Sequence, residues 1–148
     1  MTELVFVDTN VLIYARDRRE ERKRQTARLW LEHLTATNST RINLQVLNEL
    51  TRWILANDRT TELHGIRKEV DALRYWGDKP LNHEEVTMAW TIRNRLGFQW
   101  FDCLLLAAAY QLGCRYFLTE DMVHQAQFAT LTLVNPFLSS PSDILPKH

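Results

Sequence analysis

The amino-acid sequence predicts an α/β protein whose mostly parallel sheet carries helices on both faces. Short, wholly apolar runs alternate along the chain with amphipathic segments of helical length. Such runs are typical of strands buried on both faces, and their alternation with helices is typical of parallel strands joined by right-handed crossovers. Five strands are expected, at residues 4–7, 41–44, near Leu81, 115–119 and 131–134.

Capping residues mark where several of the expected helices begin and end. Asp8-Thr9-Asn10 supply three N-cap side chains for the first helix, and Asn82 caps a later helix that Gly97 closes. The last helix is apolar nearly all round and is therefore expected to be buried, with Asp102 at its opening. Helices are expected at residues 11–15, about 20–36, 44–56, 61–75, 83–96 and 101–112.

The length and composition fit one domain. A chain of 148 residues supports a single core, here residues 1–148 with a Ser/Pro-containing tail from about 136 to 148. No run approaches the roughly 20 apolar residues of a membrane span, and the N-terminus lacks a basic leader, so a cytosolic protein is expected. Cys103 and Cys114 lack histidines at metal-binding spacing and are expected to be small buried hydrophobes.

The charges are balanced overall but unevenly placed. A net charge of zero argues against a broadly basic nucleic-acid coat. Residues 16–28, however, hold seven basic and three acidic side chains. This segment is either a solvated helix face with internal ion pairs or a surface for the RNA backbone. The candidate RNA-binding residues are Arg16, Arg18, Arg19, Arg22, Lys23 and Arg24.

Four acidic residues stand at junctions between the expected elements. Asp8 closes the first strand, and Asp121 follows the run 116–118 after two further residues. The carboxyl ends of parallel strands meet at one edge of a sheet, where ligands bind. Asp102 stands at the start of the buried helix, and Glu49 borders the apolar arc of the helix at 44–56. These four side chains are therefore candidates for one site.

Each acid also has a structural explanation when taken alone. Asp8 and Asp102 fit N-caps, Glu49 fits a surface glutamate and Asp121 fits a loop residue. Several carboxylates brought together repel one another, so a packed cluster requires a cation. Oxygen ligands suit Mg²⁺, with Mn²⁺ as an alternative, and either ion would make hydrolysis of a phosphodiester feasible.

Two segments of the chain resemble a known family. Residues 5–12 look like the opening of PIN-domain ribonucleases, and residues 101–122 look like their closing half. The resemblance spans the chain in order and spacing, and it is strongest to VapC-type toxins of bacterial toxin–antitoxin pairs. It implies a three-layer α/β/α fold with a central, mostly parallel sheet of five strands. It also implies an endoribonuclease activity that depends on Mg²⁺.

The resemblance assigns roles to individual residues. Asp8, Glu49, Asp102 and Asp121 match the metal-binding and catalytic acids. Three neighbouring polar residues would orient those carboxylates, namely Thr9, Asn10 and Thr119. Two roles fit Glu120: it either assists the four acids or faces solvent, and the second role is favoured. His124 is expected to be a surface residue, because an oxygen-ligated magnesium site has little need of histidine.

Partners also follow from the resemblance. They are an RNA substrate (tRNA, rRNA or mRNA), a cognate antitoxin and a second copy of the chain in a homodimer. Five tryptophans fit either that interface or the core. Trp100 and Phe101 are candidates for stacking on unpaired bases, although core packing is favoured for Phe101.

Two other classes of protein remain open. One is an RNA-processing or structure-specific nuclease on the same scaffold. The other is a non-catalytic module that binds a cation or a partner, such as a receiver-like domain. That class typically carries a lysine after its last strand, and residues 132–136 contain none.

Overall fold

The computed structural model describes residues 3–145, which contain a five-stranded sheet in the order β2-β1-β3-β5-β4. β1, β2, β3 and β5 are parallel, and β4 lies antiparallel to β5 at one edge. The mostly parallel five-stranded sheet expected from the sequence is therefore confirmed. The strands are β1 (Val5–Val7), β2 (Thr40–Arg41), β3 (Tyr116–Leu118), β4 (Gln127–Phe128) and β5 (Leu131–Val134).

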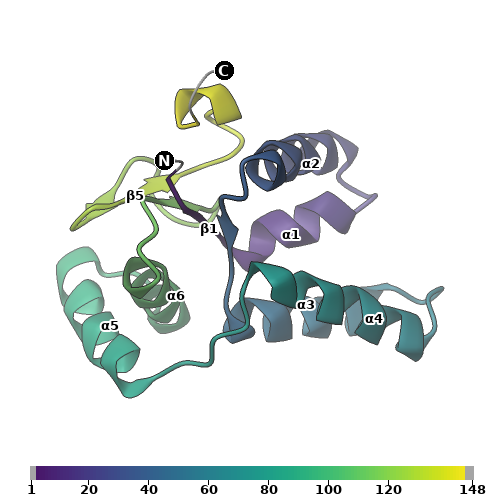
Figure 1. Ribbon diagram of the computed structural model, residues 1–148, viewed down its shortest axis with the longest axis horizontal. Helices are drawn as coiled ribbons and strands as arrows, with labels where there is room; N and C mark the ends of the chain where they lie inside the picture. Colours follow the sequence, from purple (N-terminus) through teal and green to yellow (C-terminus); the bar gives the residue numbers. More distant parts are fainter. Residues whose placement is uncertain (1–2, 146–148) are drawn as a thin grey trace.

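Six α-helices and two short 3₁₀ turns accompany these strands (Figure 1). Asn82 caps α5 by accepting a hydrogen bond from the Glu85 amide at 2.8 Å, and Gly97 ends that helix in a left-handed conformation, as predicted. The elements are α1 (Thr9–Arg16), α2 (Glu21–Ala36), α3 (Leu44–Asn57), α4 (Leu63–Leu73), η1 (Arg74–Trp76), α5 (His83–Leu96), α6 (Trp100–Gln111) and η2 (Pro141–Asp143). Within residues 3–145, no helix is long and apolar enough to cross a membrane.

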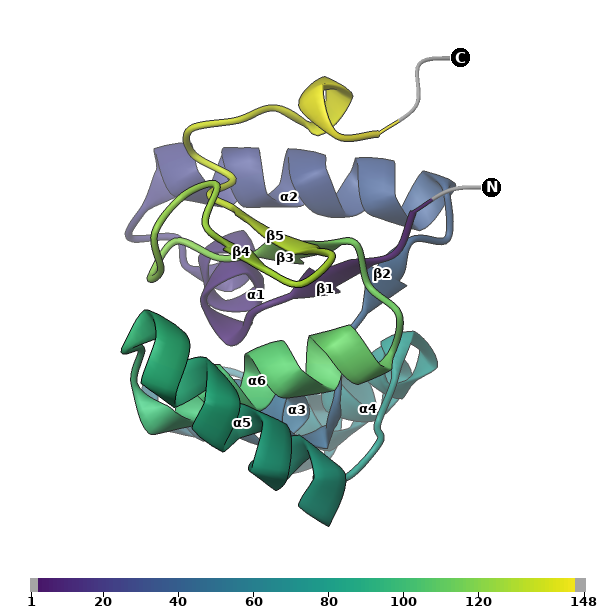
Figure 2. The same cartoon turned by 90° about the vertical axis from the view of Figure 1, so that its left-hand side faces the viewer.

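The sheet lies between two layers of helices (Figure 2). α2 and the C-terminal segment with η2 cover one face, while α3, α5 and α6 lie on the other. Phe6 and Phe117 pair in register on adjacent strands, and their buried rings stack with centroids 5.3 Å apart. Trp30 of α2 is fully buried, and its indole nitrogen donates to the Pro136 carbonyl at 2.9 Å. This bond joins α2 to the segment that begins at Pro136.

The strand predictions were wrong at two places. No strand lies near Leu81, because the chain there runs between η1 and α5 without pairing to the sheet. The fifth strand is instead β4, whose two residues are too few to leave a sequence pattern. The strand expected at 41–44 is also shorter than predicted. Asn43 accepts a hydrogen bond from the Val46 amide at 3.1 Å and caps α3, which ends the strand early.

The strand order reverses direction beside β1. From β1 the chain crosses to β2 on one side, and β3 later pairs with the other side of β1. Val7 and Leu118 end these two central strands in register. Ligands of open α/β sheets bind outside the carboxyl ends of the strands at such a reversal. The residues that directly follow β1 and β3 therefore occupy the position where a site is expected.

Candidate active site

Asp8 is the most buried of the four acids, with 4% of its surface exposed. It follows β1 and caps α1, where one carboxylate oxygen accepts from the Thr9 amide at 2.7 Å. The other oxygen accepts from the Thr119 hydroxyl at 2.8 Å. Burial raises the pKa of Asp8 to about 7, and nearby Asp102 and Glu49 add to that rise against the two hydrogen bonds. A cation beside this carboxylate would favour its charged form.

Glu49 reaches the same region from α3. One carboxylate oxygen accepts from the Thr9 hydroxyl at 2.6 Å, and the other accepts from the Gln45 amide group at 2.9 Å. Its side chain is half-buried, which fits a residue at the border of the apolar face of α3. Thr9 thus bonds to Asp8 through its backbone and to Glu49 through its side chain, and it orients both acids.

Asp102 lies in the first turn of α6. The sequence placed it at the opening of this helix, but α6 begins at Trp100 and the N-cap position belongs to Gln99. The earlier start leaves the Asp102 carboxylate inside the first turn, half-buried in the same cleft as Asp8. Burial raises the pKa of Asp102 to about 6, with further contributions from the charges of Asp121 and Glu49.

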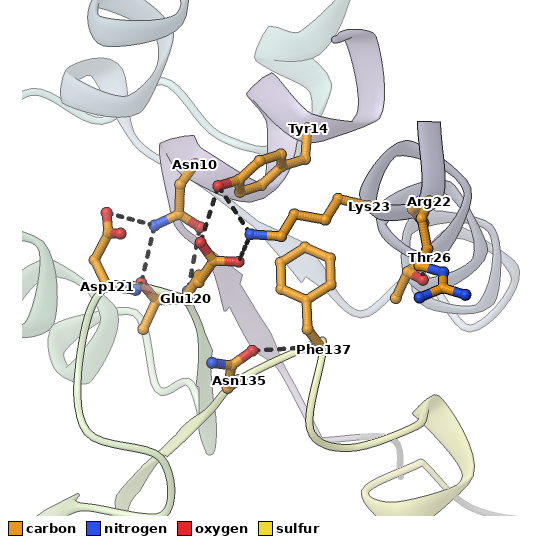
Figure 3. A network of polar contacts seen from close by, with 10 residues as sticks. Asn10, Tyr14, Arg22, Lys23, Thr26, Glu120, Asp121, Asn135 and Phe137 are labelled. Carbon is orange, nitrogen blue, oxygen red and sulfur yellow. Dashed lines mark hydrogen bonds and ion pairs between the residues drawn. The ribbon is translucent and has the colours of Figure 1, made fainter. Parts of the chain in front are cut away.

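Asn10 connects the residues that follow β1 with those that follow β3 (Figure 3). Its side-chain nitrogen lies 2.9 Å from an Asp121 carboxylate oxygen, 3.0 Å from the Thr119 hydroxyl and 3.2 Å from an Asp8 oxygen. Its side-chain oxygen accepts from the Glu120 amide at 3.3 Å. One amide side chain therefore sets the positions of two acids that are more than a hundred residues apart in the sequence.

Glu120 does not face solvent, which corrects the favoured prediction. Its carboxylate lies 2.7 Å from the Lys23 ammonium and accepts from the Tyr14 hydroxyl at 2.9 Å (Figure 3). The same ammonium lies over the rings of Tyr14 and Phe137, at 4.7 and 5.2 Å from their centroids. Tyr14 and Phe137 were not predicted as neighbours of the site, because only the folded chain brings α1 and the segment after β5 beside Glu120.

The four predicted acids line one cleft of about 390 Å³. Across residues 3–145, no three His, Cys, Asp or Glu side chains are arranged closely enough to hold an ion by themselves. Mg²⁺ needs only one or two direct carboxylates because it keeps several of its waters, so a cleft lined by four carboxylates fits it. The other lining residues are Thr9, Asn10, Ile13, Arg52, Trp53, Ala56 and Asn57, of which only Thr9 and Asn10 were predicted as site residues.

The basic segment 16–28 divides into paired and unpaired side chains. Arg16 bonds to Asp58 and Glu69 from the helical hairpin of α3 and α4, Arg19 pairs with Asp17 at 2.9 Å, and Arg24 pairs with Glu21 at 2.8 Å. In the described part of the chain, Arg18 and Arg22 form no ion pair. These two cations are therefore the least neutralised of the six RNA-binding candidates.

The structure also places the two cysteines, His124 and Phe101. Cys103 and Cys114 are buried, as predicted. His124 lies outside the cleft, where its ring accepts from the Asn135 amide at 3.0 Å. Phe101 is 66% exposed, so the favoured prediction of core packing was wrong.

The chain belongs to the PIN-domain family, whose model matches residues 5–128. That match covers the sheet order reversal and all four acids of the cleft. A comparison with curated proteins finds no match.

Several solved structures share this fold. A toxin–antitoxin complex from Klebsiella pneumoniae is 18% identical over 89% of this chain and 97% of its own, with a TM-score of 0.63. VapBC2 from Rickettsia felis, solved with a DNA fragment from its promoter, is 16% identical over 88% and 96%, with a TM-score of 0.62. VapC20 from Mycobacterium tuberculosis, a toxin that cleaves the sarcin–ricin loop, is 16% identical over 76% and 86%, with a TM-score of 0.56.

Proposed function

We propose that this protein is a Mg²⁺-dependent endoribonuclease that acts in the cytoplasm as the toxin of a toxin–antitoxin pair. The observation that carries the proposal is the convergence of Asp8, Glu49, Asp102 and Asp121, from four different elements, on one cleft at the strand-order reversal. Carboxylates gathered in this way repel phosphate unless a cation lies between them. The toxins among the structural relatives support the cellular role.

Asp8 and Asp102 would hold the ion directly, with Glu49 and Asp121 acting partly through water. Mg²⁺, or Mn²⁺ in its place, would lower the pKa of a bound water and stabilise charge on the scissile phosphate. Thr9, Asn10 and Thr119 would keep the carboxylates in position through the hydrogen bonds described above.

Asp121 is the acid best placed to accept a proton from the attacking water. Both carboxylate oxygens of Glu49 already accept hydrogen bonds, from Thr9 and Gln45. Asp121 uses only one oxygen for Asn10, and its other oxygen bonds to no side chain among residues 3–145. Its exposed position leaves that oxygen open to water and substrate.

The test is cleavage of a panel of total tRNA, rRNA fragments, synthetic mRNA and single-stranded DNA with Mg²⁺. Wild type is compared with Asp8→Asn and Asp102→Asn, and with Asp71→Asn as a matched control on the exposed face of α4. We expect wild type and the control to cleave RNA, and the two cleft variants to bind RNA without cleaving it. Cleavage that persists in EDTA, or equal activity in all four proteins, would contradict the proposal.

The partners have a separate test. A toxin of this kind is expected to bind a cognate antitoxin and to form a homodimer. Expression of wild type without the antitoxin should arrest growth, while Asp8→Asn should not, and the antitoxin encoded beside the toxin should restore growth. Arrest by both forms would show that growth inhibition does not come from the cleft.

A further inference from the structure

A second groove, of about 700 Å³, lies between the turn that follows α1 and the turn that follows α3. Residues 16–19 and 28 line one side of it, and residues 53, 57–61 and 69 line the other. Figure 1 shows both turns at the right-hand end of the molecule. We call it the arginine groove, because five of its lining side chains are arginines.

Ion pairs use up all the negative charge of the arginine groove. Its lining contains three carboxylates, and each of them is paired with an arginine of the same lining. The pairs are Arg16 with Asp58 and Glu69, and Arg19 with Asp17. The bonds of Arg16 join the end of α1 to the hairpin of α3 and α4, so they hold the two sides of the groove together.

The other three arginines of the groove are Arg18, Arg28 and Arg59. They form no ion pair within residues 3–145, and all three are exposed. They come from the turn after α1, from α2 and from the turn after α3, so their charges surround the groove. A guanidinium group suits phosphate, because its fork of N–H donors can bond to two phosphate oxygens at once. The arginine groove is therefore a candidate site for phosphate groups.

The arginine groove adjoins the acidic cleft. Trp53 and Asn57 of α3 line both of them. The Arg19 guanidinium lies over the Trp53 ring, 6.0 Å from its centroid. Arg52 lines the cleft beside Trp53, and it too forms no ion pair in the part of the chain that the structure describes. Unpaired arginines are thus present both in the cleft and in the groove next to it.

We propose that the arginine groove binds phosphates of the RNA strand that neighbour the one cleaved in the acidic cleft. The inference rests on the proposed function and adds a separate binding site to it. The four carboxylates of the cleft repel the neighbouring phosphates, because a bound Mg²⁺ offsets only part of their charge. Cations in the adjoining groove oppose that repulsion. Contacts with phosphates rather than bases hold the strand in position without reading its sequence.

The position of the groove favours a nucleic-acid backbone over an acidic segment of a protein partner. Either ligand would neutralise the three unpaired arginines. The proposed reaction already requires a phosphate of the substrate in the cleft, and the same strand can continue into the groove because Trp53 and Asn57 border both. An acidic peptide that followed the same course would meet four carboxylates and gain nothing from the cleft.

The experiment measures, by anisotropy, how the affinity for a fluorescein-labelled oligouridylate depends on salt concentration. Asp8→Asn in Mg²⁺ is the background, so that the probe is not cleaved. Arg18→Gln and Arg59→Gln are made in that background, singly and together. Arg22→Gln is the matched comparison, because it removes the same charge from the same basic segment. Arg22 is exposed and forms no ion pair over residues 3–145, but it lies outside both the groove and the cleft.

We expect each groove variant to reduce the slope of log affinity against log salt by about 0.7, the value for one lost phosphate contact on a single strand. The double variant should reduce the slope by about twice as much, and Arg22→Gln should leave it as in the background. An equal reduction by Arg22→Gln would overturn the inference, since binding would then depend on net charge alone. So would groove variants that bind RNA as the background does but lose affinity for the antitoxin, since the groove would then hold a protein segment.

Failure of the groove inference and failure of the nuclease proposal give different results. If wild type cleaves RNA but the groove variants keep the full salt slope, only the groove inference is wrong. If wild type cleaves nothing but the groove variants reduce the slope, the groove binds the RNA backbone and the nuclease proposal is wrong.

Discussion

Asn10 is the side chain on which the arrangement of the acids depends most directly. Its amide nitrogen is shared among Asp8, Thr119 and Asp121, and its oxygen holds the Glu120 amide. An amide group suits this position because it offers donors to carboxylates and also an acceptor to the backbone. A carboxylate at the same place would add repulsion to a cleft that already holds four acids.

Asn10→Ala is therefore expected to loosen the two strand-end acids without removing any of them. Loss of a side chain that orients metal ligands lowers metal affinity or activity by about 10- to 100-fold. The measurement is the Mg²⁺ concentration at half-maximal cleavage, together with kcat. Asn48→Ala, at an exposed position of α3, is the control. An unchanged Mg²⁺ requirement in Asn10→Ala would mean that the hydrogen bonds of Asn10 serve only the fold.

Two contacts at the scale of elements tie α2 to the loops that follow β3 and β5. Lys23 pairs with Glu120 beside the site, and Trp30 bonds to Pro136 on the face of the sheet that α2 covers. α2 therefore supports the loop that carries Asp121 from one side, while Asn10 of α1 supports it from the other. Neither contact is visible in a local pattern, since each joins segments more than ninety residues apart.

The pair of Lys23 and Glu120 is expected to act as one unit. Lys23→Met and Glu120→Gln should each lower cleavage severalfold, because either change releases the same loop, and the double variant should lose little more. The measurement is a double-mutant cycle on kcat/KM. If Lys23 instead contacts RNA by itself, Glu120→Gln should leave cleavage unchanged or improve it while Lys23→Met lowers it.

Trp30 is expected to contribute strongly to the stability of the layer formed by α2. Trp30→Ala should lower the free energy of unfolding by about 3–5 kcal/mol, through lost burial and the cavity that remains. Chemical denaturation measures this change. Trp90→Ala is the matched control, because Trp90 is largely exposed and its removal should cost far less. Equal losses in the two variants would contradict the assignment of Trp30 to the core.

At the scale of the whole molecule, the reversal of strand order is what creates the cleft. β1 and β3 end side by side, so the residues after them meet at one edge of the sheet. α3 and α6 then add Glu49 and Asp102 from the helical layer beneath. Gathering four carboxylates at this edge opposes folding when no cation is present.

The cost of the gathered acids predicts how the stability of the metal-free protein depends on pH. The pKa values of Asp8 and Asp102 are raised to about 7 and about 6 in the folded state, from 3.8 for the free side chains. The folded state then binds protons more tightly than the unfolded state. Protonation of Asp8 and Asp102 therefore stabilises the folded state fully below pH 3.8, and this stabilisation is lost as pH rises through 6 and 7.

Thermal melts of wild type and Asp8→Asn at several pH values test that dependence. The melting temperature of Asp8→Asn relative to wild type should increase as pH rises through 7 in EDTA, because the variant has no charge to desolvate at this position. Mg²⁺ should raise the melting temperature of wild type more than that of the variant. A difference between the proteins that stays constant with pH, and no response to Mg²⁺, would contradict the account.

The sequence by itself determined the α/β class, the caps of α5 and the positions of Asp8, Glu49 and Asp121 relative to their elements. Those properties depend on local patterns: apolar runs, helical periodicity and capping side chains that act within a few residues. Only the tertiary structure decided the rest, including β4, the pairing of Glu120 with Lys23 and the exposure of Phe101. Each of these depends on which distant segment packs beside the residue. The residues next to it in the sequence do not indicate which segment that is.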